Sequence, residues 1–215
     1  MTRDCLARPA LLAACLQRAL AFTVDRRSLV LGVGLVVAMH GASAQAPVGQ
    51  PAGKGADPCT EFVARLPNMQ ARLCASAQLK PTAGRSVQGR TLYQRDVVAS
   101  DAKIRVLVVG AMHGDELSSA SVALHWIQRA METPSNVHWR FIPALNPDGL
   151  MARPARRVNA NGVDLNRNFP TPNWTRDAKI YWEQRTKKDP RRWPGPKTLS
   201  EAESAFFHDQ RERFQ

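Results

Sequence analysis

The sequence predicts an α/β fold in which a mixed, mostly parallel sheet is flanked by helices. Residues 103–109 (KIRVLVV) form an apolar, β-branched run that is typical of a strand buried on both faces. Residues 117–131 carry apolar side chains at helical spacing, and residues 137–145 form a second apolar run. A strand, a helix and a strand in succession indicate a βαβ unit, whose two strands run parallel.

Shorter elements are expected on both sides of this unit. Residues 59–79 have a helical pattern that Pro81 and Gly84 should close, and residues 84–97 read as a hairpin with Gly89 in its turn. Near the other end, residues 200–203 (SEAE) have the spacing of a capping box and should open a helix that runs to about Phe214.

The first 58 residues are expected to precede the folded domain. Residues 25–46 place Arg26 and Arg27 before an apolar run at 29–39 and a small-residue site at 42–44, which predicts an export signal, with the arginine pair resembling a twin-arginine signal. The run is too short for a permanent membrane anchor. Residues 1–24 are an extension of unclear status, residues 47–58 a flexible lead-in, and residues 59–215 the domain.

Composition excludes several classes of protein. In 215 residues, 44% are hydrophobic, 22% are charged and four are cysteines, which excludes a disordered chain, a collagen-like repeat and a disulfide-dense miniprotein. In an exported chain, Cys59 and Cys74 suit a disulfide, with two reduced thiols as the alternative. The net charge of +12 suits anionic partners, and for an exported protein these are cell-wall polymers, acidic peptides or a membrane surface rather than nucleic acid. Solubility alone is the alternative explanation.

Polar clusters follow both predicted parallel strands, where ligands collect in α/β sheets. The first is HGDE at 113–116 and the second is NPDG at 146–149. His113 and Glu116 can turn toward one point and offer an imidazole and a carboxylate to a zinc ion. The alternatives are that Glu116 only complements the helix dipole and that NPDG is only a turn.

A third cluster, residues 156–170, packs three arginines, four asparagines and one aspartate around a few apolar residues. Guanidinium groups bind carboxylates through two parallel hydrogen bonds, and asparagine amides add neutral donors. The cluster is therefore suited to binding a carboxylate, and the alternative is that it is only a solvated polar loop.

Together, HGDE at 113–116, NPDG at 146–149 and R-x-N-x-x-GVDLNRNFP at 157–170 resemble the zinc metallocarboxypeptidases related to carboxypeptidase A, particularly the bacterial branch that includes murein peptide amidase. The resemblance implies that His113 and Glu116 are the first two ligands of one Zn²⁺ ion. It implies that Arg157 polarises the scissile carbonyl and stabilises the oxyanion. Asn166 and Arg167 would hold the terminal carboxylate of the substrate.

The resemblance also implies residues for which the chain has no matching position. The family uses a third histidine ligand, a substrate-side tyrosine and a glutamate general base that takes a proton from a zinc-activated water. No remaining histidine or tyrosine stands at such a position: His125, His138, His208, Tyr93, Tyr181. We therefore expect the N-terminal part only of a zinc carboxypeptidase-like catalytic domain, incomplete at its C-terminus.

The expected protein is a periplasmic or secreted metallocarboxypeptidase that hydrolyses a C-terminal or cell-wall peptide bond. Its partner is a peptide or murein peptide with a free carboxylate, not nucleic acid, and its oligomeric state is not predicted. Two alternatives remain open: an inactive truncated fragment acting as a basic cell-wall binding module, and an N-acyl amino acid deacylase of the aspartoacylase type. The basic stretch 185–192 favours an acidic wall substrate or is a solvated loop.

Overall fold

A computed structural model describes residues 57–133 and 135–214. The chain divides into two compact units, residues 1–46 and 47–215, and the described residues all belong to the second. The predicted extension at 1–24, the export signal at 25–46 and all but the last two residues of the lead-in lie outside the described residues.

The centre of the domain is a four-stranded mixed sheet with the strand order β1-β2-β4-β3. The strands are β1 (Lys80–Arg85), β2 (Thr91–Val97), β3 (Ile104–Val109) and β4 (Val137–Ile142). β3 and β4 pair in parallel, as expected of the βαβ unit, whereas the β1–β2 and β2–β4 pairs are antiparallel. The mixed α/β fold is confirmed, but parallel pairing among the described strands is limited to one pair because the hairpin adds two antiparallel strands.

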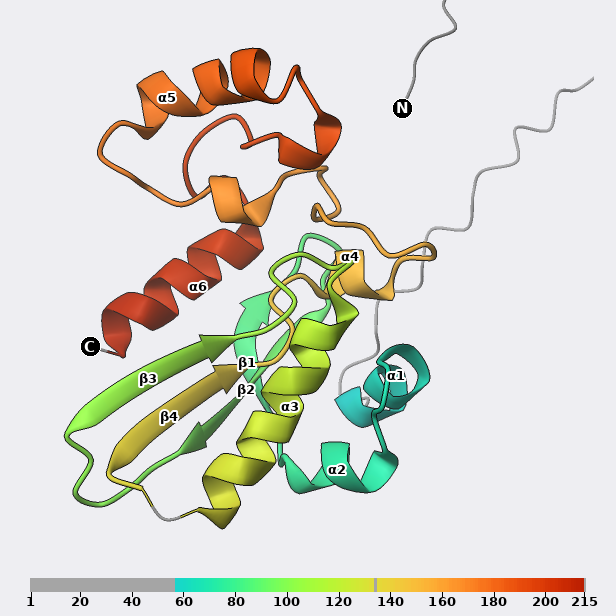
Figure 1. Cartoon of the computed structure of the whole chain (residues 1–215), viewed down its shortest axis with the longest axis vertical. Coiled ribbons are helices and arrows are strands. Elements are labelled where there is room, and N and C mark those ends of the chain that lie inside the picture. Colours follow the sequence, from blue (N-terminus) through green and yellow to red (C-terminus); the bar gives the residue numbers. More distant parts are fainter. Residues whose placement is uncertain (1–56, 134, 215) are drawn as a thin grey trace, which may run out of the picture. The chain divides into compact units, whose positions relative to one another are not determined.

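Helices cover both faces of this sheet (Figure 1). Alternate residues of a strand point to opposite faces. Accordingly Phe141 packs in a core cluster with helix α3 (Leu117–Glu132), while the next residue, Ile142, packs with the helix α6 (Ala202–Arg213) residues Phe206 and Phe207. The predicted helices at 117–131 and from about 202 are therefore confirmed. α3 buries an apolar stripe against one face of the sheet, and α6 packs two partly buried phenylalanines against the other.

The predicted helix over 59–79 is two helices, α1 (Pro58–Arg65) and α2 (Ala71–Ser76). The break follows from Pro67, because a residue before proline avoids the helical region, and Leu66 is extended. A disulfide joins Cys59 in α1 to Cys74 in α2, as expected. Pro81 and Gly84 do not close a helix but lie in β1, an edge strand where proline is tolerated.

Two further expectations differ from the structure. The strand at 103–109 was expected to be buried on both faces, yet β3 is an edge strand among the described residues and Ile104 is 53% exposed. The capping box is not formed, because Glu201 is the residue before α6 and its side chain makes no cap bond. Ser200 and Glu201 instead bond to each other and to asparagines of the 156–168 loop.

Between β4 and α6 the chain forms only short helices. These are α4 (Pro147–Met151), η1 (Leu165–Arg167), α5 (Trp174–Ile180), η2 (Tyr181–Arg185) and η3 (Pro190–Arg192). No helix in the described part of the chain has the length and apolar character needed to span a membrane. The long run of loops and single turns brings many polar side chains to one end of the sheet.

Candidate metal and carboxylate site

The HGDE and NPDG clusters meet beyond the carboxyl ends of β3 and β4, where the two backbones touch. A Cβ atom on Gly114 would lie 2.2 Å from the carbonyl carbon of Gly149, so only glycine fits there. NPDG is not a free turn, because Asn146 caps α4 by accepting a hydrogen bond from the Gly149 amide. The side chain of Asn146 also donates to the carbonyl of Arg157, which brings the third cluster to the same place.

His113 lies between two carboxylates. Its Nδ1 is 2.9 Å from Oε1 of Glu116, and its Nε2 is 3.0 Å from Oδ1 of Asp164. In the tautomer whose proton is on Nε2, the imidazole donates to the buried Asp164 carboxylate, and the Nδ1 lone pair is then directed at Glu116. A cation between Nδ1 and Oε1 would satisfy both atoms, and this nitrogen and oxygen pair is one that zinc uses. The two residues therefore fit a zinc ion.

Glu116 does not cap the helix that follows it. It is the residue before α3, yet its side chain makes no cap hydrogen bond and is 53% exposed. The carboxylate contacts His113 and lies 3.7 Å from Nη1 of Arg157. The dipole explanation for this glutamate therefore does not account for where its side chain points.

Asp164 is the residue that sequence reasoning missed. Its side chain is fully buried and accepts hydrogen bonds from His113, from Nε of Arg157 at 3.1 Å and from the amide of Asn166 at 3.1 Å. Burial raises the pKa of this carboxyl, but the hydrogen bonds from His113 and the charge of Arg157 outweigh burial and hold the pKa below its usual value. The sequence signal that could have identified Asp164 is its position as a single acid between two apolar residues, Val163 and Leu165. Both of these neighbours are fully buried in the structure.

Of the two adjacent arginines, Arg157 faces the site and Arg156 is exposed. The Arg157 guanidinium bonds to Asp164, and its side chain is only 12% exposed. The choice of Arg157 rather than Arg156 as the site residue therefore agrees with where these two side chains lie, although the role of Arg157 stays a prediction.

Asn166 and Arg167 lie in η1, directly after Asp164, and line a cavity of about 390 Å³. The Arg167 guanidinium lies 5.5 Å from the centre of the Tyr181 ring, which lines the same cavity. The sequence assigns no role to Tyr181, which does not match the family's tyrosine position, and the structure brings it beside the predicted carboxylate-binding pair.

The other histidines in the described part of the chain do not join this cluster. His125 lies in α3, His138 in β4 and His208 in α6. Within residues 57–133 and 135–214, no three His, Cys, Asp or Glu side chains are arranged to hold a metal ion. Zinc hydrolases use three protein ligands, and His113 with Glu116 accounts for two of them.

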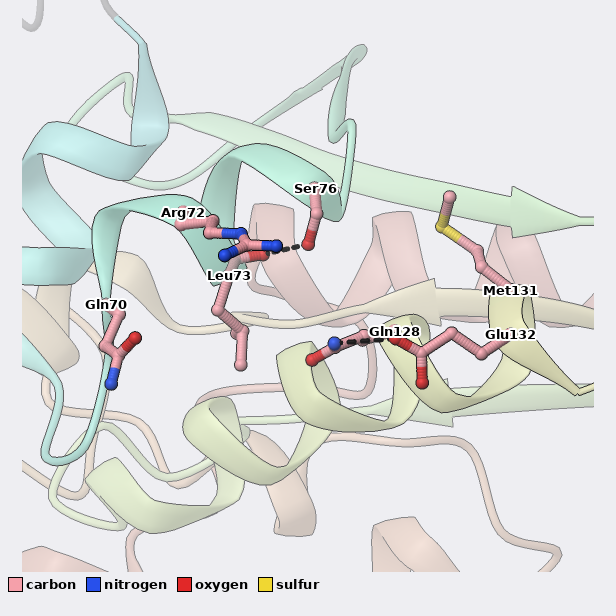
Figure 2. A pocket seen from close by; sticks show the side chains of 7 residues that line it. All are labelled: Gln70, Arg72, Leu73, Ser76, Gln128, Met131 and Glu132. Atoms are coloured by element: carbon pink, nitrogen blue, oxygen red, sulfur yellow. Dashed lines mark hydrogen bonds between the residues drawn. The ribbon is translucent and has the colours of Figure 1, made fainter.

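A cavity of about 400 Å³ between α2 and α3 is a weaker candidate (Figure 2). Three of its polar side chains bond within their own helices: Ser76 donates to the carbonyl of Leu73, and Gln128 donates to Glu132. It contains no imidazole, and we assign it no role.

Comparison with known proteins identifies the class to which this fold and site belong. Residues 69–210 match the zinc carboxypeptidase family, and the chain is a member of it. Carboxypeptidase A from Helicoverpa armigera superposes with a TM-score of 0.52 at 22% identity, covering 67% of this chain and 41% of that one, which shows the shared fold.

More specific similarity is to murein peptide amidases. Murein peptide amidase A of Escherichia coli (strain K12) is 40% identical over 98 residues, which are 46% of this chain and 38% of that protein. Murein peptide amidase A of Vibrio campbellii is 37% identical over 115 residues, 52% of this chain and 44% of that protein. The catalytic chain of human carboxypeptidase N is 33% identical over 128 residues, 47% of this chain and 27% of that protein. The chain thus spans less than half the length of these curated relatives.

Proposed function

We propose that the protein is an exported zinc-dependent peptide hydrolase that acts on a C-terminal or cell-wall peptide bond. The observation that carries the proposal is the placement of His113 between two carboxylates, with Arg157 bonded to one of them. Family membership and the similarity to murein peptide amidases support a peptide substrate. Export rests on the sequence at 25–46 and suits a wall-derived substrate.

In this proposal His113 and Glu116 bind zinc, which, when present, supplies a Lewis acid for the scissile carbonyl and for water. Asp164 holds the imidazole of His113 in one orientation and one tautomer, as the outer partner of a metal-bound histidine does. Arg157 presents a fixed positive charge to the oxygen that becomes negative during the reaction.

Asn166 and Arg167 recognise the chain end. Both residues line one cavity, and the amide of Asn166 bonds to Asp164, which also contacts His113. A substrate carboxylate bound in this cavity would therefore place its peptide bond near His113. A guanidinium beside an amide binds a carboxylate with defined geometry, which selects peptides that end in a free acid over peptides that end in an amide.

The test measures zinc and peptide separately. Purified full-length protein is titrated with zinc in competition with a chromophoric chelator, and we expect His113→Ala to lose high-affinity binding while His125→Ala, which removes a histidine outside the site, keeps it. In parallel, a non-hydrolysable dipeptide analogue with a free carboxylate should bind, and its amidated form should not. Unchanged zinc binding by His113→Ala would refute the assigned metal site.

A further inference from the structure

The two predicted metal ligands lie on one short loop, residues 110–116, which joins the end of β3 to the start of α3. His113 is in the middle of this loop and Glu116 is its last residue. The separation of the imidazole from the carboxylate therefore depends on the backbone path of the loop. A group that fixes this path positions both ligands.

The side chain of Ser119, in the first turn of α3, joins the two ends of the loop. Its Oγ accepts a hydrogen bond from the amide of Ala111 at 2.8 Å, and the same hydroxyl donates to the carbonyl of Glu116 at 2.7 Å. A serine hydroxyl has one proton to donate, so donation to Glu116 leaves the oxygen as an acceptor for Ala111. One side-chain oxygen thus links the backbones of the second and the last residue of the loop.

Ala111 depends on this bond more than an ordinary loop residue does. It is 1% exposed, so water does not replace a lost partner of its amide. Its φ is +41°, in the left-handed region that alanine adopts only at a cost in free energy. Without the Ser119 hydroxyl, the amide would be buried without this acceptor and the backbone at Ala111 would be free to relax. Because Ala111 is two residues before His113, such a relaxation would move the imidazole relative to Glu116.

A purely local role for Ser119 does not account for both of its bonds. Donation to the carbonyl three residues earlier is a common pattern of serine in helices. The bond from Ala111, eight positions earlier, is not a helical one. The nearby Ser121 shows the contrast, because its hydroxyl donates to the carbonyl of Pro67 and ties α3 to the segment between α1 and α2 instead of to the loop.

We propose that Ser119 is a positioning residue for the metal site, whose hydroxyl holds the 110–116 loop in the conformation that brings His113 and Glu116 to one point. This inference rests on the proposed function, in which those two residues bind zinc. Replacing residues that orient metal ligands from outside the coordination sphere weakens metal binding by about 10–100-fold. Ser119 contacts the backbone of Glu116 and not its carboxylate, so we expect the lower end, about tenfold.

The first measurement is the zinc affinity of purified full-length protein in competition with a chromophoric chelator. Ser119→Ala should weaken zinc binding about tenfold. Ser119→Thr should restore it, because threonine keeps the hydroxyl and its Oγ1 can bond to the carbonyl three residues earlier in a helix. Ser119 lines a surface cavity of about 420 Å³, which leaves room for the added methyl group.

Two serines of the same helix are matched controls. Ser118→Ala removes an exposed hydroxyl next to Ser119 and should keep the zinc affinity. Ser121→Ala removes the buried hydroxyl that bonds to Pro67 at 2.9 Å, so it should lower the urea midpoint of unfolding and still keep the zinc affinity. The second control separates a general loss of stability from a loss of ligand position.

A second measurement needs no metal. Amide hydrogen exchange of the metal-free protein reports how readily the hydrogen bond of the Ala111 amide opens. Ser119→Ala should speed exchange at Ala111 about tenfold, which corresponds to the loss of one hydrogen bond. Ser119→Thr and Ser118→Ala should exchange at the rate of the unaltered protein.

Four outcomes would overturn the inference: an unchanged zinc affinity in Ser119→Ala, no recovery in Ser119→Thr, an equal loss of affinity in Ser121→Ala, or unchanged exchange at Ala111 in Ser119→Ala. Failure of the proposed function has a different signature. If the unaltered protein binds no zinc, or if His113→Ala binds it equally well, the assigned metal site is wrong, and the exchange rate at Ala111 still decides whether Ser119 holds the loop.

Discussion

Replacing Asp164 by asparagine tests whether one buried carboxylate organises the whole site. Asparagine keeps the shape of the side chain but removes its charge and turns one acceptor oxygen into a donor. In the structure both oxygens accept, one from His113 and from the Asn166 amide and the other from Arg157. Whichever way the amide is turned, its NH₂ group faces a donor.

The size of the effect follows from burial. Removing one partner of a buried charge pair costs about 3–5 kcal/mol, because the other charge is left without compensation. Asp164 is fully buried, but the Arg157 side chain retains some contact with solvent, so we expect the lower end, about 3 kcal/mol of the free energy of unfolding.

Urea unfolding at neutral pH measures this loss. The matched control is Asp177→Asn, which breaks an exposed ion pair with Arg176 in α5 and should leave the unfolding midpoint unchanged. A midpoint for Asp164→Asn that equals that of the unaltered protein would show that His113 and Arg157 do not depend on this carboxylate, and our account of the site would be wrong.

Two further predictions concern parts of the domain that support the site. Replacing Cys59 and Cys74 by serine should lower the free energy of unfolding by about 3 kcal/mol, since the disulfide closes a loop of 15 residues, and reducing agent should then have no further effect in urea unfolding. Burial raises the pKa of Glu203, so its contribution to stability is present below its unfolded pKa of 4.5 and is lost as pH rises through the folded pKa. The stability difference between the unaltered protein and Glu203→Gln should therefore fall as the pH rises above 4.5, and a constant difference would contradict this assignment.

The elements that the sequence predicted correctly are those set by neighbouring residues. The β3-α3-β4 unit follows from local apolar periodicity, and the turn of the β1–β2 hairpin follows from Gly89, whose φ is +80°. The prediction failed where a residue's hydrogen bonds are made to a partner distant in the sequence. Ser200 and Glu201 have capping-box spacing, but they bond to asparagines more than 30 positions earlier.

The same distinction holds for the site. The motif order named His113 and Glu116, which the structure brings within hydrogen-bond distance. Asp164 escaped assignment because its role depends on His113, 51 positions earlier in the chain. Tyr181 was not assigned because its segment returns to Arg167 through a hydrogen bond from the Trp174 indole and a cation–π contact, and neither contact leaves an apolar pattern in the sequence.

The disulfide between α1 and α2 sets a condition on the proposed route of export. Disulfides form in oxidising compartments, and thiols in the bacterial cytosol are kept reduced. A twin-arginine route, which carries folded proteins, would have to accept a domain whose α1 and α2 are joined only by side-chain packing, with Cys59 and Cys74 still as thiols. A chain exported unfolded would instead close this bond as it folds. Under the proposed export, the order of delivery and oxidation would therefore determine the first folded form of the domain.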